Sequence, residues 1–154
     1  MRTVDRQWFD ASMAVTWGLA HRVEAWPDHL PHYRHVRRLA GATGGDGVVE
    51  MAAWRPFGGP LDWPTWWRSQ MWVDHDSHEV RYRHVAGITA GMDVWWTLRA
   101  EGPSRTEVTI VHEWTGPRWP LIGGIATRAV IGPVFVHGIA SRTLAGLAAA
   151  AGRS

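Results

Sequence analysis

The fold of this chain is decided by the stretch IATRAVIGPVFVHGIA, from Ile125 to Ala140, which continues as SRTLAGLAAAAG. Apolar residues recur in it at helical spacing: Ile131, Phe135 and Ile139 lie four residues apart. Because so little of the stretch favours water, we expect a long helix, Ile125–Ala151, that is covered on more than one side. Its uninterrupted apolar part is far shorter than the roughly 20 residues that a bilayer span needs, so the cover is protein.

The pair Gly132 and Pro133 interrupts this helix in its middle. A proline ring removes one backbone hydrogen bond and collides with the preceding turn, so we expect a kink or a break here. Two interpretations stay open: two helices that abut, or one helix whose bend shapes a pocket wall.

Upstream of the helix, hydrophobicity alternates with a period of two in segments from Tyr33 to Trp114, which is typical of strands. We expect a first strand, a short helix capped by Asp10 or Ser12, and a further short turn near Asp28. The predicted strands are Thr3–Phe9, His32–Leu39, Val48–Trp54, Thr65–Asp74, Glu79–Val85, Met92–Leu98 and Val108–Trp114, with an irregular segment at Arg55–Pro64. The predicted fold class is therefore α+β: an antiparallel sheet of about seven strands, curved around the C-terminal helix in a single domain, 1–154.

Composition narrows the function. The chain has no cysteine, which excludes disulfides, thiolate metal sites and thiol nucleophiles. Its net charge is only +2, and its basic residues, all arginines, are scattered, which argues against nucleic acid as a partner. No N-terminal stretch combines a basic region, an apolar run and a cleavage site, so we expect a cytoplasmic protein without integral membrane contact.

Twelve tryptophans are the compositional anomaly. A domain of this size cannot easily pack so many large rings in its centre, so we expect several of them to line a cavity. Walls of flat rings suit a flat or aromatic hydrophobic ligand.

Four polar side chains fall on inward positions of the predicted strands: Tyr33, Tyr82, His84 and His112. A histidine that titrates near neutral pH and a tyrosine hydroxyl can together move the protons of an acid–base reaction. The alternative is that they are ordinary core residues with satisfied hydrogen bonds. The remaining histidines do not follow a metal-binding spacing, and we predict neither a metal nor a cofactor.

Several motifs resemble the START-like, helix-grip proteins (the SRPBCC superfamily), and among them the polyketide cyclases, including aromatase/cyclases. They are VEAWPDHLPHYRHV (Val23–Val36), VRYRHV (Val80–Val85), GMDVWWTL (Gly91–Leu98), TEVTIVHEW (Thr106–Trp114) and ASRTLAGL near the end of the chain. The resemblance implies a pocket that contains Trp26, Tyr33, Trp96 and His112. The sequence departs from the family at one position. The family's cyclases have an arginine in the pocket, and the matching position here lies near Met71. Arg68 is close in sequence, but alternation predicts that its side chain points away from the inward face.

The resemblance implies a polyketide cyclase of the kind found in antibiotic biosynthesis, which folds a poly-β-keto chain and catalyses aldol cyclisation and dehydration without a cofactor. An acyl carrier protein would deliver that chain. The predicted catalytic residues are His112, Tyr33 and His84, and the predicted ligand contacts are Trp26, Trp67, Tyr82, Trp96, Trp114 and Phe135. The alternative is a non-catalytic binding or transport protein for a lipid, a quinone or a similar hydrophobe.

Overall fold

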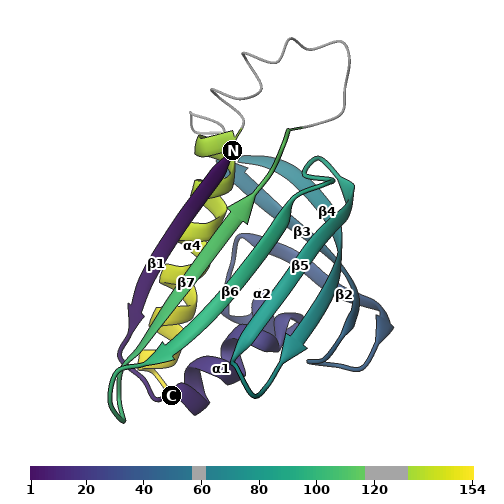
Figure 1. Cartoon of the computed structure of the whole chain (residues 1–154). Coiled ribbons are helices and arrows are strands. Elements are labelled where there is room, and N and C mark those ends of the chain that lie inside the picture. The colour runs from purple at the N-terminus through teal and green to yellow at the C-terminus, as the bar shows by residue number, and fades with distance from the viewer. Residues whose placement is uncertain (57–61, 117–131) are drawn as a thin grey trace.

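The computed structural model describes residues 1–56, 62–116 and 132–154, without the side chains of Pro56 and residues 132–135. Figure 1 shows a strongly curved sheet with one long helix and, near one end, a group of short helices. In chain order the elements are β1 (Arg2–Phe9), α1 (Met13–His21), a 3₁₀ turn η1 (Val23–Ala25), α2 (Trp26–His29), β2 (Tyr33–Gly41), β3 (Gly47–Pro56), β4 (Asp62–Asp74), β5 (Glu79–Gly87), β6 (Asp93–Ala100), β7 (Thr106–Glu113) and α4 (Gly132–Gly152). The predicted order of strands and helices is confirmed.

The sheet has seven strands in the order β1-β7-β6-β5-β4-β3-β2. Every neighbouring pair is antiparallel, so the predicted fold class is confirmed. Alternation holds along the inner strands: on β5, Val80, Tyr82 and His84 are buried, whereas Arg81 and Arg83 are exposed. One boundary differs from the prediction with a consequence for the site. β3 extends to Pro56, so Arg55 belongs to a strand and not to an irregular segment.

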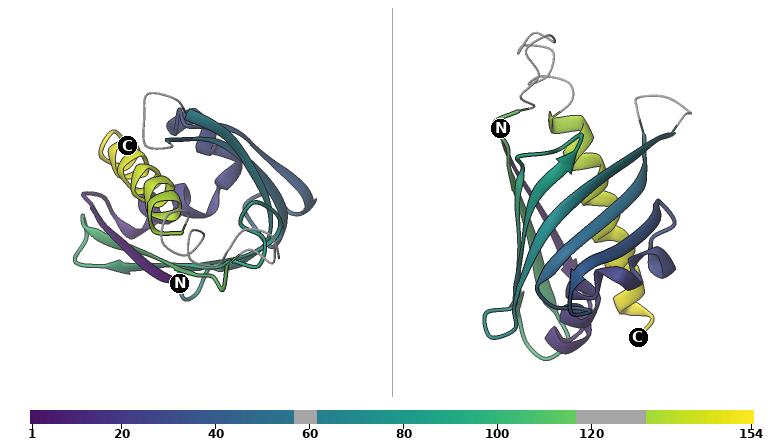
Figure 2. Two further views of the ribbon diagram at one scale, coloured as in Figure 1. Left: turned by 90° about the horizontal axis from the view of Figure 1, so that it is seen from above. Right: turned by 90° about the vertical axis from the view of Figure 1, so that its right-hand side faces the viewer.

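Helix α4 closes the open side of the curved sheet, as the view from above in Figure 2 shows. It packs against β1, β3 and β7 and against the two short helices α1 and α2. The buried positions recur at intervals of three and four residues: Val136, Ile139, Ala140, Thr143, Leu144, Leu147, Ala150 and Ala151.

The expectation that this helix is covered on more than one side is wrong for the described part. A second face, which includes His137, Arg142, Ala145 and Ala149, is exposed, because histidine and arginine favour water and alanine tolerates it without a hydrophobic partner. The described helix begins at Gly132, with Pro133 in its first turn, where a missing N–H costs no helical hydrogen bond. The predicted helical residues Ile125–Ile131 lie outside the described residues.

Local contacts fix α4 against the rest of the chain. The imidazole of His137 pairs with the carboxylate of Asp5, which is buried on the edge strand β1. Toward the other end of the helix, Leu30 approaches Gly146 so closely that a Cβ at Gly146 would lie 2.3 Å from Leu30 Cδ2. Helix α1 is capped as predicted: the Ser12 hydroxyl accepts a hydrogen bond from Val15 N at 3.3 Å.

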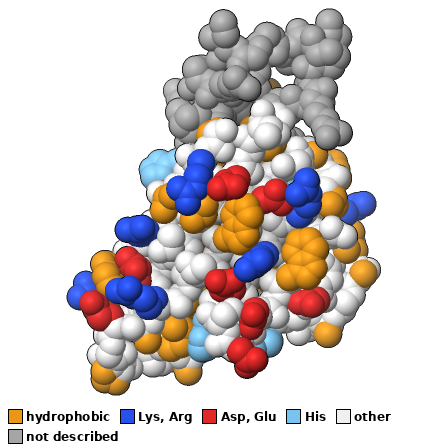
Figure 3. Space-filling model, viewed as in Figure 1, with side chains coloured by type: hydrophobic (Ala, Val, Ile, Leu, Met, Phe, Trp, Pro, Cys, Tyr) orange, Lys and Arg blue, Asp and Glu red, His pale blue; other side chains and the backbone are white. Residues whose placement is uncertain are grey.

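The outer face of the sheet carries charged side chains of both signs and hydrophobic side chains among them (Figure 3). Several of its arginines form ion pairs along the strands, for example Arg83 with Asp93 at 2.9 Å and Arg68 with Glu50 at 3.0 Å. Among the described tryptophans, Trp54, Trp66 and Trp72 are exposed on this face. Trp63 is also exposed, but it lies opposite Arg55 on the inward side of β4. Among the described residues, no helix is both long enough and apolar enough to cross a membrane.

Candidate functional site

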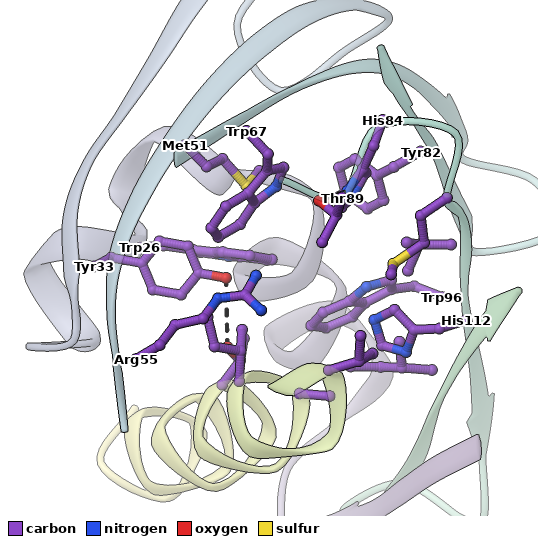
Figure 4. Close-up of a pocket in the computed structure, with 17 residues that line it drawn as sticks. Trp26, Tyr33, Met51, Arg55, Trp67, Tyr82, His84, Thr89, Trp96 and His112 are labelled. Carbon is purple, nitrogen blue, oxygen red and sulfur yellow. Dashed lines mark hydrogen bonds between the residues drawn. The ribbon is translucent and has the colours of Figure 1, made fainter. Parts of the chain in front are cut away.

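A cavity of about 60 Å³ lies between the inner face of the sheet and α4 (Figure 4). Its walls are mostly apolar, and it is lined by Trp26, Tyr33, Met51, Arg55, Trp67, Tyr82, His84, Thr89, Met92, Val94, Trp96, Ile110, His112, Val136, Ile139, Ala140 and Thr143. Pockets that enclose drug-sized ligands usually measure about 300–1,000 Å³. A ligand larger than a small ring system must therefore move some of these side chains.

Seven of the nine residues predicted for the site line this one cavity: Tyr33, His84, His112, Trp26, Trp67, Tyr82 and Trp96. Trp114 is buried on the inner face as alternation predicts, but it is not among the lining residues, and its indole N–H donates to the Ala90 carbonyl at 3.1 Å. The side chain of Phe135 lies outside the described residues.

Arg55 is the charged site residue that the sequence analysis missed. It is 4% exposed, and its guanidinium lies over the Trp67 ring, with Cζ 5.2 Å from the ring centroid. Burial lowers the pKa of Arg55 to about 9, with Tyr33 acting in the opposite direction, so the group stays charged at neutral pH. Arg68, by contrast, points to the outer face and pairs with Glu50, while Met71 is buried. The cation of this cavity therefore comes from β3, not from β4.

Two neutral imidazoles line the cavity wall across from Arg55 (Figure 4). Burial and the charge of Arg55 lower the pKa of His112 to about 3. Burial, His112 and Arg55 lower the pKa of His84 to about 3 as well. Each ring has a threonine partner: His112 Nδ1 lies 3.4 Å from Thr3 Oγ1, and His84 Nδ1 lies 2.6 Å from Thr89 Oγ1. Both rings are therefore uncharged at neutral pH and held in orientation by one nitrogen.

Tyr33 brings a hydroxyl group to the same side of the cavity as Arg55 (Figure 4). Burial raises the pKa of Tyr33 to about 12, against the opposing effects of the Thr143 hydrogen bond and of Arg55. Thr143 Oγ1 donates to the Tyr33 hydroxyl oxygen at 3.4 Å and lies 3.3 Å from His32 Nε2. Tyr33 is thus a protonated phenol at neutral pH and a potential hydrogen-bond donor.

Stacked and edge-on rings build the apolar part of the wall. Trp26 contacts Trp96 at a centroid distance of 5.3 Å and Tyr33 at 5.4 Å, and Trp67 stacks on His84 at 6.0 Å. The Trp26 indole N–H donates to the Leu19 carbonyl at 2.9 Å, so α1 fixes this ring. The expectation that several tryptophans line a cavity is met by three of them, while the four named above are exposed.

Outside the cavity, His21 and His75 gather around Trp17, with His21 stacked on its ring at 4.9 Å. In the part of the chain that the structure describes, no group of three or more His, Asp or Glu side chains could hold a metal ion. What the cavity combines is a buried cation and a phenol on one side with two uncharged bases on the other. Such a set can stabilise an oxygen anion while a neutral base accepts a proton.

No protein-family model matches the sequence, and no curated protein matches it. Solved structures do. The Zhui aromatase/cyclase from a Streptomyces species superposes with a TM-score of 0.82 at 18% identity, over 99% of this chain and 94% of that chain. The di-domain aromatase/cyclase StfQ of the steffimycin biosynthetic pathway gives 0.73 at 18% identity, over 98% of this chain and 45% of that one. A START superfamily protein from Mycobacterium smegmatis gives 0.69 at 12% identity, over 94% of both chains.

These likenesses confirm the START-like, helix-grip fold that the sequence motifs predicted. The structures that share it include two aromatase/cyclases, one of them from the steffimycin biosynthetic pathway.

Proposed function

We propose that this protein is a polyketide cyclase of the aromatase/cyclase type, acting without a cofactor on a poly-β-keto chain. One observation carries the proposal. The buried Arg55 guanidinium lies on one side of an apolar cavity, and the neutral imidazoles of His112 and His84 lie on the other. The fold shared with aromatase/cyclases supports the same reaction class.

In the proposed reaction, His112 accepts a proton from the carbon between two carbonyl groups. Nδ1 of His112 is held by Thr3, so the tautomer with Nδ1–H leaves the Nε2 lone pair for this task. The electron pair of the broken C–H bond moves onto a carbonyl oxygen, and the resulting enolate lies against Arg55 and Tyr33. Both groups donate hydrogen bonds to the developing anion in a site with little water, where such bonds are strongest.

The enolate carbon then attacks a second carbonyl of the same chain, and a new C–C bond forms. The alkoxide oxygen takes up a proton from the imidazolium of His112, which returns to its neutral form. Removal of a further proton from the adjacent carbon, with departure of the hydroxyl as water, completes the dehydration. His84 is the second neutral base within the cavity and the alternative acceptor for either proton.

The small cavity volume bears on how the substrate enters. About 60 Å³ accommodates the reacting segment of a chain better than a whole polyketide. In this proposal the remainder stays attached to an acyl carrier protein, which is therefore the required protein partner.

The test is turnover of a linear poly-β-ketone supplied by a reconstituted synthase and carrier protein, with product identified by mass spectrometry. His112→Phe should reduce turnover by about 10²–10⁴-fold, the usual contribution of a general base. Arg55→Gln should reduce it by about 10²–10³-fold, as the loss of an oxyanion donor does. Binding of an aromatic product analogue should persist in His112→Phe, because the tryptophan walls remain. Equal turnover in wild type and both variants would refute the proposed roles.

A second function, the carriage of a hydrophobic molecule, is favoured by two observations. Both imidazoles already have threonine partners, as satisfied core histidines do, and most of the lining is apolar. A wild-type protein that forms no product but copurifies with a small hydrophobe in native mass spectrometry would establish the carrier function instead.

A further inference from the structure

Thr143 is placed unusually for a threonine within a helix. Ser141, two residues earlier, returns its hydroxyl to the helix and donates to the His137 carbonyl at 2.7 Å. The Thr143 hydroxyl instead points away from the helix axis toward the start of β2. There it lies 3.4 Å from the Tyr33 hydroxyl oxygen and 3.3 Å from Nε2 of His32, the residue just before the strand. At 1% exposure Thr143 is cut off from water, so these two partners satisfy its hydroxyl.

The contacts form a line from the edge of the protein into the cavity. His32 is half-buried beside the ion pair of Arg142 with Asp62, Thr143 follows, and the Tyr33 hydroxyl ends the line next to Arg55. The His32 ring also packs on the Tyr33 ring at a centroid distance of 4.9 Å. Burial, together with the charge of Arg142, lowers the pKa of His32 to about 4, so its ring is neutral at physiological pH and carries a single N–H.

The direction of the hydrogen bonds has a chemical consequence. The Tyr33 oxygen accepts the hydrogen of Thr143, and the Thr143 oxygen can in turn accept the Nε2–H of His32. A phenol has only one hydrogen to donate, and here that hydrogen is left for the cavity. Bonds aligned head to tail also polarise one another, which strengthens the last donor.

We infer that Thr143 and His32 are positioning residues that orient the Tyr33 O–H toward the position to which the Arg55 guanidinium also donates. The two groups together form a two-donor site for a ketone oxygen. The ligand class that this site selects is a carbonyl compound conjugated to, or next to, a flat apolar group that lies against Trp26 and Trp96. A ketone oxygen fits two donors because it carries two lone pairs and no hydrogen of its own, whereas an alcohol brings a further hydrogen that needs an acceptor. The inference rests on the proposed function only in taking the cavity as the binding site of a carbonyl compound.

The experiment uses acetophenone labelled with ¹³C at its carbonyl carbon. The NMR chemical shift of that carbon moves downfield as hydrogen bonds to the oxygen become stronger, and a purely structural change does not mimic this effect. The variants Tyr33→Phe and Arg55→Gln each remove one donor, and they give the reference chemical shifts of the carbonyl carbon in a bound ketone that lacks that hydrogen bond. Thr143→Val keeps the shape of threonine but removes the hydroxyl, and Thr143→Ser keeps the hydroxyl.

We expect Thr143→Val to move the bound carbonyl signal upfield, toward its position in Tyr33→Phe, and to weaken binding about three- to tenfold. Thr143→Ser should restore the wild-type signal, and Ser141→Ala should leave it unchanged. His32→Gln, whose amide can still donate to Thr143, should lie close to wild type, whereas His32→Leu should resemble Thr143→Val.

Two outcomes would overturn the inference in different ways. A bound ketone whose carbonyl shift is the same in wild type, Thr143→Val and His32→Leu would show that neither residue positions Tyr33, while leaving the cyclase proposal intact. No saturable binding of acetophenone to the wild-type protein would remove the carbonyl site itself, and with it both the inference and the proposed enolate chemistry.

Discussion

Acid should destabilise this protein through the two imidazoles of its cavity. An unfolded histidine binds a proton below pH 6.5, whereas folded His84 and His112 stay neutral until the pH falls to about 3. Between these limits the unfolded state holds more protons than the folded state, so the free energy of unfolding falls as the pH falls. From pH 6.5 to pH 5 each histidine costs about 2 kcal/mol, since one pKa unit corresponds to about 1.4 kcal/mol.

Together the pair removes about 4 kcal/mol by pH 5, a large part of a typical stability of about 5–15 kcal/mol. His21 and His32, whose pKa values are also lowered by burial, add to the loss in the same direction. The assay is urea unfolding at pH 7.5 and at pH 5, followed by tryptophan fluorescence. Few carboxylates change their charge in this window, because their usual pKa values lie near 4.

The variant His112→Phe separates this effect from general acid sensitivity. It carries no titrating group at this position, so its loss between the two pH values should be about 2 kcal/mol smaller than that of the parent. The control is His29→Gln, a half-buried position outside the cavity lining, which should retain the parental loss. If His112→Phe and the parent lose the same free energy, His112 is not a buried neutral base, and the proposed catalytic role fails with it.

Two further predictions concern packing and ligand size. Gly146→Ala places a Cβ 2.3 Å from Leu30 Cδ2, so overpacking of about 1–3 kcal/mol should outweigh the gain of about 1 kcal/mol in helix propensity. A Cβ added at Gly138 would have no heavy atom within 4 Å, so Gly138→Ala should stabilise the same helix by about 0.5–1 kcal/mol. Thermal unfolding compares the two variants, and equal stabilisation by both would contradict the contact between Gly146 and Leu30. Trp96→Ala should enlarge the cavity and favour anthraquinone over benzoquinone in fluorescence titrations, relative to the parent. Trp72→Ala, on the outer face, should bind both quinones as the parent does, and an unchanged preference in Trp96→Ala would contradict the cavity.

Much of the fold could be predicted from the sequence, because successive side chains of a strand alternate between the inner and outer faces of the sheet. Alternation correctly placed Tyr82, His84 and His112 on the inward face, and all three line the cavity. The helical period likewise identified α4 as the partner of the sheet. Its exposed second face was missed, because alanine and glycine are compatible with both burial and exposure.

The missed residues had weaker signals of the same kind. Val49, Met51 and Ala53 alternate inward along β3, and one more step reaches Arg55. The proline and the glycines that follow in the sequence made the strand seem to end too early. Thr143 lies three residues after Ala140 and four before Leu147, on the buried face of the helix, but its partners come from β2 and depend on tertiary packing. The bond of Trp114 to Ala90 depends on the path of a loop, which no local pattern specifies.

The pairing of the first strand with the seventh also determines when a cavity can exist during folding. Arg2 lies opposite Glu113, and Asp5 on the same strand holds His137 of the final helix. These contacts close loops of more than a hundred residues, and such closures are the slow steps of folding. Strands β2 to β6 can form their hairpins early, but the wall that carries His112 stays without its edge strand, and Thr143 is absent, until β1 and α4 dock. The cavity is therefore complete only when β1 and α4 have docked, and a hydrophobic ligand enclosed by all of its walls stabilises the completed domain, not a partly folded chain.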